Sequence, residues 1–125
     1  ANEWLEASEL HDLERVFLAT PTSTPERTRR AAELSRGFTY AVSTMGITGA
    51  RTEIDANARK VVNNLRDTKL EQNIAVGIGI STAEQVLEVN QYADAAIVGS
   101  AFVRAYQSGG LAELVAKTQE LNPNK

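Results

Sequence analysis

Two short apolar runs, each ending in glycine and passing directly into a helical pattern, constrain this chain most. The first is I-A-V-G-I-G-I-S at residues 74–81, and the second is A-I-V-G-S-A at residues 96–101. A continuous β-branched run is typical of a buried strand in a parallel sheet, and a helix that begins just past it points free backbone N–H groups outward. Two such strand ends predict an anion site, suited to phosphate, at the carboxyl edge of a parallel sheet.

The rest of the chain alternates strand and helix patterns. A helix is expected at about residues 2–10, followed by four strand-helix units with strands at residues 15–20, 38–43, 74–78 and 95–98. Alternation at this spacing favours a parallel sheet with right-handed crossovers. Four such units make either a small open α/β sheet or half of an eight-stranded (β/α)8 barrel.

Cap and stripe patterns predict where the helices begin and which sides they bury. A helix begins near residue 25, with either Ser23 in a capping box or Thr24 as the cap before Pro25. Asp55 is expected to cap a second helix after a long polar loop at residues 44–57, and a capping box on Ser81 begins a third. A break is expected at residues 108–110. The predicted buried stripes are Ala58, Val61, Val62 and Leu65, then Ala83, Val86, Leu87 and Asn90, then Leu111, Leu114, Val115 and Leu121.

Composition excludes several classes of function. The 125 residues are 42% hydrophobic and 23% charged, which is typical of one globular domain. A formal net charge of -3 gives no general attraction to nucleic acid or to an anionic membrane. The chain has no cysteine and a single histidine, so no metal site is expected. No apolar run approaches the roughly 20 residues that span a bilayer, and a cytoplasmic protein is expected.

The candidate phosphate ligands are backbone amides at glycines and helix starts. Gly79, Gly99 and Ser100 have that placement after two strands, and Gly49 in the long loop is a further candidate. An alternative is that Gly77 and Gly99 merely permit bends or close packing in a crowded sheet.

Two hydroxyl residues come from the second strand and its loop. Tyr40 and Thr48 either face a ligand or serve as a core aromatic and a turn residue. The chain is poor in titratable groups at strand ends, because Glu53 and Asp55 lie in the loop and Asp94 precedes a strand. The sequence therefore predicts an anion pocket without a catalytic pair.

Four segments, in order, resemble consecutive motifs of the tryptophan synthase alpha subunit family. They are L-A-T-P-T-S-T-P-E-R, S-T-M-G-I-T-G-A-R, G-I-G-I-S-T-A-E-Q and A-I-V-G-S-A-F-V-R. The resemblance covers nearly the whole chain but only the carboxyl-terminal half of the family's (β/α)8 barrel. It implies that residues 1–125 form a single domain of about half a barrel, as an N-terminally truncated fragment of a larger protein.

The resemblance also implies a reaction. The family cleaves indole-3-glycerol phosphate to indole and glyceraldehyde 3-phosphate, a lyase step in tryptophan biosynthesis that needs no cofactor in this subunit. Indole then passes to a beta subunit that depends on pyridoxal phosphate. The catalytic Glu and Asp belong to the half of the barrel that this sequence does not contain. The parent protein is therefore expected to be an enzyme, and the 125-residue chain alone is expected to be inactive.

The family's binding residues map onto six positions. The resemblance implies that Thr48 helps to position the catalytic aspartate, that Tyr40 lies near the indole moiety, and that residues 46–57 correspond to a mobile loop. The implied phosphate contacts are Gly49, Gly79, Gly99 and Ser100.

Half of a barrel exposes an unpaired strand edge on each side and is expected to seek a partner. Self-association through these edges is therefore one expectation for the isolated chain. Two alternatives to the lyase remain open at this point. One is a self-associating phosphate-binding half-barrel without catalysis, and the other is a fragment of another phosphate-binding barrel, such as an isomerase or an epimerase.

Overall fold

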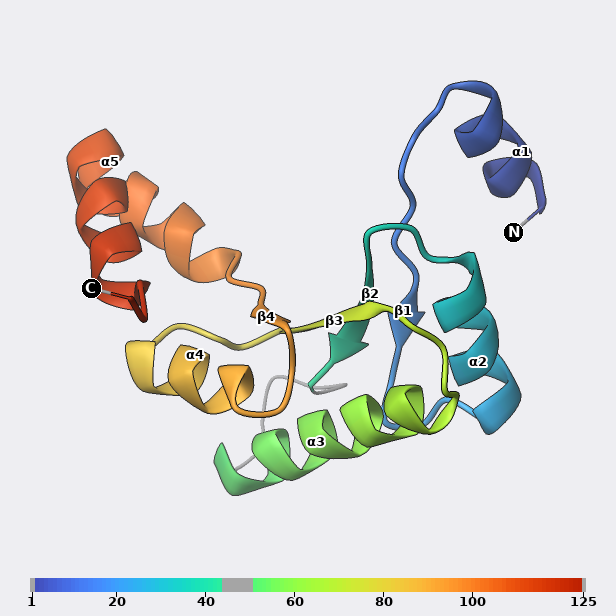
Figure 1. Cartoon of the computed structure of the whole chain (residues 1–125). Coiled ribbons are helices and arrows are strands. Elements are labelled where there is room, and N and C mark those ends of the chain that lie inside the picture. The colour runs from blue at the N-terminus through green and yellow to red at the C-terminus, as the bar shows by residue number, and fades with distance from the viewer. Residues whose placement is uncertain (1, 44–50, 125) are drawn as a thin grey trace.

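The fold is a four-stranded parallel sheet whose strands alternate with helices (Figure 1). The computed structural model describes residues 2–43 and 51–124, with side chains from residue 56 onward in the second range. The strand order is β1-β2-β3-β4, and each adjacent pair is parallel. This confirms the predicted alternation. The elements are α1 (Asn2–Leu10), β1 (Leu18–Ala19), α2 (Pro25–Leu34), β2 (Phe38–Val42), α3 (Arg51–Asp67), β3 (Asn73–Gly77), α4 (Ala83–Asn90), β4 (Ala95–Ala96) and α5 (Ser100–Leu121).

The strand register gives the sheet one covered and one open face. One row across the sheet pairs Ala19, Ala41, Val76 and Ala96, and its first three members are fully buried. Alternate side chains on a strand point to opposite faces, so the adjacent row, Leu18, Tyr40, Ala75 and Ala95, faces the other way. Leu18 in that row is 56% exposed.

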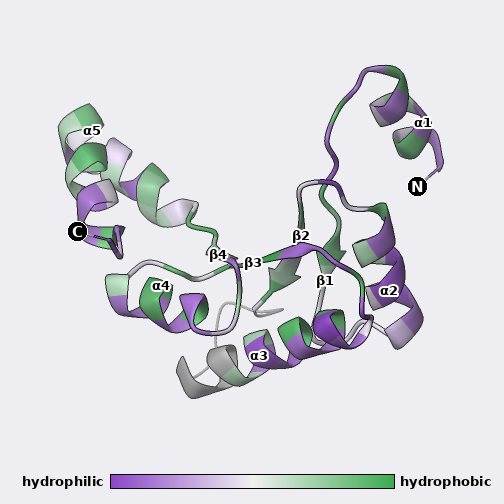
Figure 2. Cartoon of the chain, in the orientation of Figure 1, coloured by the Kyte–Doolittle hydropathy of each residue, from purple (hydrophilic) through white to green (hydrophobic). Residues whose placement is uncertain are grey.

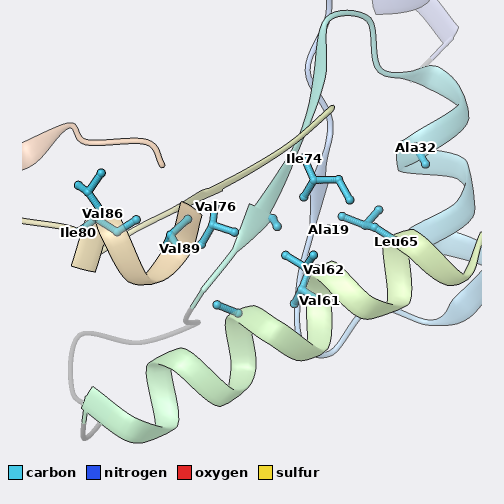
Figure 3. Close-up of a cluster of buried hydrophobic side chains, with 12 residues drawn as sticks. Ala19, Ala32, Val61, Val62, Leu65, Ile74, Val76, Ile80, Val86 and Val89 are labelled. Carbon is cyan, nitrogen blue, oxygen red and sulfur yellow. The ribbon is translucent and has the colours of Figure 1, made fainter. Parts of the chain in front are cut away.

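Helix α3 supplies more residues to the core beneath the covered face than any other element does (Figure 3). Its predicted stripe of Ala58, Val61, Val62 and Leu65 is buried, with no member more than 1% exposed. These side chains meet Ile74 and Val76 from β3, and Val86 and Val89 of α4 extend the same cluster. A spacing of i, i+3, i+4, i+7 places the four α3 residues on one side of the helix, which explains the burial.

Helix starts differ in detail from the predictions. Thr24 caps α2 by accepting a hydrogen bond from Arg27 N, with Pro25 as first helical residue, which decides between the two alternatives. The second capping box is one residue later than predicted, because Thr82 and Gln85 form it. Helix α3 already begins at Arg51, so the prediction of Asp55 as its cap was wrong. Of the predicted loop at residues 44–57, residues 51–57 are therefore helix, and residues 44–50 lie outside the described residues.

The outer strands are shorter than predicted, and α4 buries different residues from those predicted. The outer strands β1 and β4 each comprise two residues, instead of the six and four predicted. In α4, Leu87 and Asn90 are exposed, while Val89 is buried in their place. The predicted break in the last helix is confirmed, since Gly109 and Gly110 have non-helical dihedrals within α5.

Several large apolar side chains of α5 are exposed, and Figure 2 marks the hydrophobic stretches of this helix in green. Of its predicted stripe, Leu121 is buried, whereas Leu111 and Val115 are exposed. Val103 and Tyr106 on the same helix are also exposed. Within residues 2–43 and 51–124, no helix is long and apolar enough to cross a membrane.

Candidate functional site

The candidate site lies at the carboxyl edge of the sheet, where β3 ends in the turn Gly77-Ile78-Gly79. Ile78 has a φ of 76° and Gly79 a φ of 84°, so both adopt the left-handed region. Glycine enters this region without cost, but a β-branched residue does so only under strain. Strained residues persist where surrounding contacts hold them, and they cluster at binding sites.

Ser43, directly after β2, supplies those contacts. Its hydroxyl Oγ lies 2.6 Å from the carbonyl oxygens of both Gly77 and Ile78, between which it shares its single proton, and its backbone N–H donates to the Gly77 oxygen at 3.0 Å. The residue is only 2% exposed. The end of β2 therefore holds two successive peptide groups of the β3 turn.

Tyr40 of β2 packs directly over Gly77. A Cβ atom added at Gly77 would fall on the Tyr40 hydroxyl and only 2.8 Å from its ring atom Cε1. No other residue type leaves room for the ring in this position. This confirms the alternative interpretation of Gly77, which attributed the glycine to close packing, and it places a hydroxyl beside the turn.

Burial raises the pKa of the Tyr40 hydroxyl above its ordinary value of 10.0, and a hydrogen bond from the Ile78 backbone opposes part of that shift. Tyr40 is therefore a neutral hydroxyl at physiological pH. The Ile78 backbone donates to the hydroxyl oxygen, so this hydrogen bond does not use the Tyr40 proton.

A pH prediction follows from the shifted pKa of Tyr40. The folded chain holds this proton more tightly than the unfolded chain, so the corresponding stability is complete below pH 10 and is lost as pH rises through the folded-state pKa. Replacement of Tyr40 by Phe removes that loss. Urea denaturation at a series of pH values from 8 upward, ~0.5 unit apart, should show a shallower decline for Tyr40→Phe than for the unsubstituted chain. Parallel curves would contradict the assignment.

The second strand end is formed by Gly99 and Ser100 at the start of α5. Gly99 is the N-cap, has no side chain to cap the helix, and accepts hydrogen bonds from Phe102 N and Val103 N. A Cβ atom at Gly99 would meet nothing within 4 Å. The first amides of α5 therefore lie beside open space, with the positive end of the helix dipole behind them.

The register brings these features to one edge. Val76 pairs with Ala96 in adjacent parallel strands, and Gly79 and Gly99 each lie three residues further along. Tyr40 joins them through its contact with Gly77. Gly79, Gly99, Ser100 and Tyr40 thus belong to the same end of neighbouring units. Thr48 and Gly49 lie outside the described residues.

Sequence reasoning missed Ser43. Ser43 was only the last residue of the strand predicted at residues 38–43, and a serine at the end of a strand does not by itself indicate a function. The role of Ser43 depends on the pairing of β2 with β3. This pairing brings Ser43 into contact with Gly77 and Ile78, which are 34 and 35 positions later in the chain. Within the described ranges, no group of three His, Cys, Asp or Glu side chains is placed to hold a metal ion.

Comparison with known proteins gives a family. The family model described as tryptophan synthase alpha chain matches residues 1–124. The chain belongs to the tryptophan synthase alpha chain family. A curated tryptophan synthase alpha chain from Leifsonia xyli is 58% identical over 110 residues, covering 88% of this chain and 42% of the relative. That from Mycobacterium avium is 47% identical over 121 residues, covering 97% of this chain and 44% of the relative.

Solved structures agree with the family assignment. A crystal structure of tryptophan synthase from M. tuberculosis, in an aminoacrylate-bound form, matches with a TM-score of 0.81 and 40% identity over 97% of this chain and 44% of that chain. The tryptophan synthase alpha subunit from Campylobacter jejuni matches with a TM-score of 0.82, at 25% identity, over 97% of this chain and 48% of that one. The fold of this tryptophan synthase alpha family member is thus about half of a (β/α)8 barrel. This sets aside the alternative of an isomerase or epimerase barrel.

Proposed function

We propose that this chain is the carboxyl-terminal half of a tryptophan synthase alpha chain, in which it binds the phosphate of indole-3-glycerol phosphate. The parent enzyme would be a lyase that cleaves this substrate to indole and glyceraldehyde 3-phosphate in tryptophan biosynthesis. The chain spans about 44% of the length of curated relatives that it matches over nearly all of its own length. The observation that carries the proposal is the family match together with two glycine-containing strand ends at one edge of the sheet.

The proposed phosphate contacts are backbone amides. The amide of Gly79 and the amides of Gly99 and Ser100 at the start of α5 lie at the same edge. Gly49 is the remaining proposed contact. Backbone amides and a helix N-terminus bind phosphate without a cationic side chain, which fits a chain whose net charge is negative. Tyr40 would face the indole moiety, and Thr48 would help to position the catalytic aspartate.

The remaining parts of the reaction are proposed to lie outside this chain. The catalytic Glu and Asp would come from the amino-terminal half of the barrel, so the 125-residue chain alone would not turn over. No cofactor is proposed for this subunit, because pyridoxal phosphate would belong to the beta subunit. The beta subunit would receive the indole product.

A chimera tests the proposal. In the alpha chain of Mycobacterium avium, the region that corresponds to residues 1–124 is replaced by this sequence, and indole release from indole-3-glycerol phosphate is measured. We expect the chimera to release indole and the 125-residue chain, freed of full-length enzyme, to release none above background. A folded chimera without activity would refute the proposed function, and activity of the chain alone would refute the assignment of catalysis to the other half.

Two serines of α5 provide a matched pair for the same assay. Ser100→Asp places a carboxylate beside the proposed phosphate, whereas Ser108→Asp adds the same charge at an exposed position further along the helix. Like charges brought together without a compensating cation repel strongly, so Ser100→Asp should raise KM on the order of tenfold or more. Ser108→Asp should leave KM unchanged. Equal KM values for both variants would place the phosphate elsewhere.

Self-association of the isolated chain is a second proposal, favoured by its open edges. Within the described residues, β1 pairs with β2 alone and β4 with β3 alone. A hollow of about 560 Å³ beside β4 has a mixed lining, with apolar side chains such as Val98 and Phe102 next to polar ones such as Asp94. Unpaired edges with exposed apolar surface favour association. Sedimentation should detect species larger than 13.5 kDa, and a stable, folded monomer would contradict this proposal.

A further inference from the structure

We infer that Ser43 is a positioning residue of the proposed phosphate site, because it orients the Ile78–Gly79 peptide so that the Gly79 N–H faces the ligand. The inference rests on the proposed function, since it concerns the same phosphate. Ser43 is 2% exposed, and its hydroxyl proton is shared between two carbonyl oxygens that each lie 2.6 Å from Oγ. It is therefore placed to act through the backbone and has no exposed atom with which to touch the phosphate itself.

Peptide geometry connects Ser43 with the amide of Gly79. In a planar trans peptide, the C=O and the N–H of the same group point in opposite directions. The Ile78 carbonyl points to Ser43 Oγ at 2.6 Å, so the Gly79 N–H points away from Ser43 and from the end of β2. Gly79 is exposed, and a Cβ atom there would meet nothing within 4 Å. The amide is therefore directed into open space at the carboxyl edge.

The preceding peptide provides an internal check. The Gly77 carbonyl accepts hydrogen bonds from both the N–H and the Oγ of Ser43, so the Ile78 N–H must point the opposite way. That N–H meets the hydroxyl of Tyr40, to which the Ile78 backbone is hydrogen-bonded. Ser43 and Tyr40 thus hold the two sides of the same peptide group.

The strain at Ile78 explains why such restraints are needed. Its φ of 76° costs about 1–2 kcal/mol for a residue with a Cβ, and rotation of the 77–78 peptide would return it to negative φ. That rotation would break the hydrogen bonds of the Gly77 carbonyl with Ser43. Without the hydroxyl, both carbonyls lose a partner, and the turn can relax into conformations that no longer present the Gly79 N–H.

The test measures phosphate affinity and stability separately. The 15N-labelled 125-residue chain is titrated with inorganic phosphate, and the amide signal of Gly79 is followed by NMR. Binding of phosphate to the unsubstituted chain should shift that signal. Ser43→Ala should bind phosphate about tenfold more weakly, as expected when one amide contact to a charged group is lost. Ser43→Thr, which keeps the hydroxyl, should retain the affinity of the unsubstituted chain.

Thr39→Val is the matched control for loss of a buried hydroxyl. Thr39 lies in β2, the strand that ends just before Ser43, is fully buried, and donates to Gln72 Oε1 at 2.5 Å near the amino end of the sheet. Its replacement should lower the free energy of unfolding without weakening phosphate binding. If Ser43→Ala binds phosphate as tightly as Thr39→Val, the role of Ser43 is refuted while the proposed site stands. If the unsubstituted chain does not bind phosphate, the proposed site is refuted, and the role of Ser43 with it.

Discussion

Leu65→Ala is expected to lower the free energy of unfolding by about 2–5 kcal/mol. Leu65 is fully buried on α3 and belongs to the cluster that joins this helix to β3, where it lies near Ile74 (Figure 3). Truncation to Ala removes apolar surface from the core and leaves a cavity that the β-sheet above α3 cannot close by shifting. Both effects act in the same direction.

Leu87→Ala provides the matched control for this substitution. Leu87 was predicted to face the core with the rest of its stripe, but it is 50% exposed on α4. The same change of side chain should therefore cost about 1 kcal/mol or less. Urea denaturation followed by circular dichroism would give both values. Equal losses would show that Leu65 does not lie in the core described for α3.

The contrast between α3 and α4 shows what helical periodicity predicts well. From residue 57 to the end of α3, the apolar residues 58, 61, 62 and 65 fall on one side and every other position is polar, so only one face of this part can be buried. Helix α4 has only eight residues, and its apolar positions include Val86, Leu87 and Val89, which span more than one face. Its burial depends on where β4 lies, and sequence spacing does not contain that information.

The outer strands show a second limit of sequence reasoning. The apolar patterns at residues 15–20 and 95–98 extend beyond the paired residues of β1 and β4. A strand is defined by its hydrogen-bonded partners, and each outer strand has a partner on one side only within the described residues. Arg15, predicted within the first strand, is instead buried and donates to Leu34 O and Ser8 Oγ, which joins α1 to the end of α2.

The candidate site was predictable where it depended on local sequence and unpredictable where it depended on pairing. Gly79, Gly99 and Ser100 follow apolar runs and begin helical patterns, so their place at strand ends could be read from the sequence. The contacts of Ser43 with Gly77 and of Tyr40 with Gly77 join residues more than 30 positions apart. They depend on the register of β2 against β3, which pairs Val42 with Gly77.

Gly77→Ala is expected to lower the free energy of unfolding by about 1–3 kcal/mol, the usual cost of an added methyl group in a packed site. The new Cβ would overlap the Tyr40 hydroxyl and lie 2.8 Å from Cε1, so the ring must swing away as a whole. Tyr40 would then lose its hydrogen bond with the Ile78 backbone, which is one of the restraints on the β3 turn.

The displaced ring gives a second measurement that a general loss of stability would not produce. If Tyr40 moves toward solvent, the burial that raises its pKa is lost, and spectroscopic titration should show this pKa returning toward 10.0. Gly99→Ala is the control, because its new Cβ meets nothing within 4 Å, and it should cost less than about 1 kcal/mol with no change in the Tyr40 pKa. A stable Gly77→Ala variant with an unchanged Tyr40 pKa would contradict the contact between these two residues. Because that contact joins β2 to the turn that presents Gly79, such a result would also remove one of the two restraints on which the phosphate-binding geometry depends.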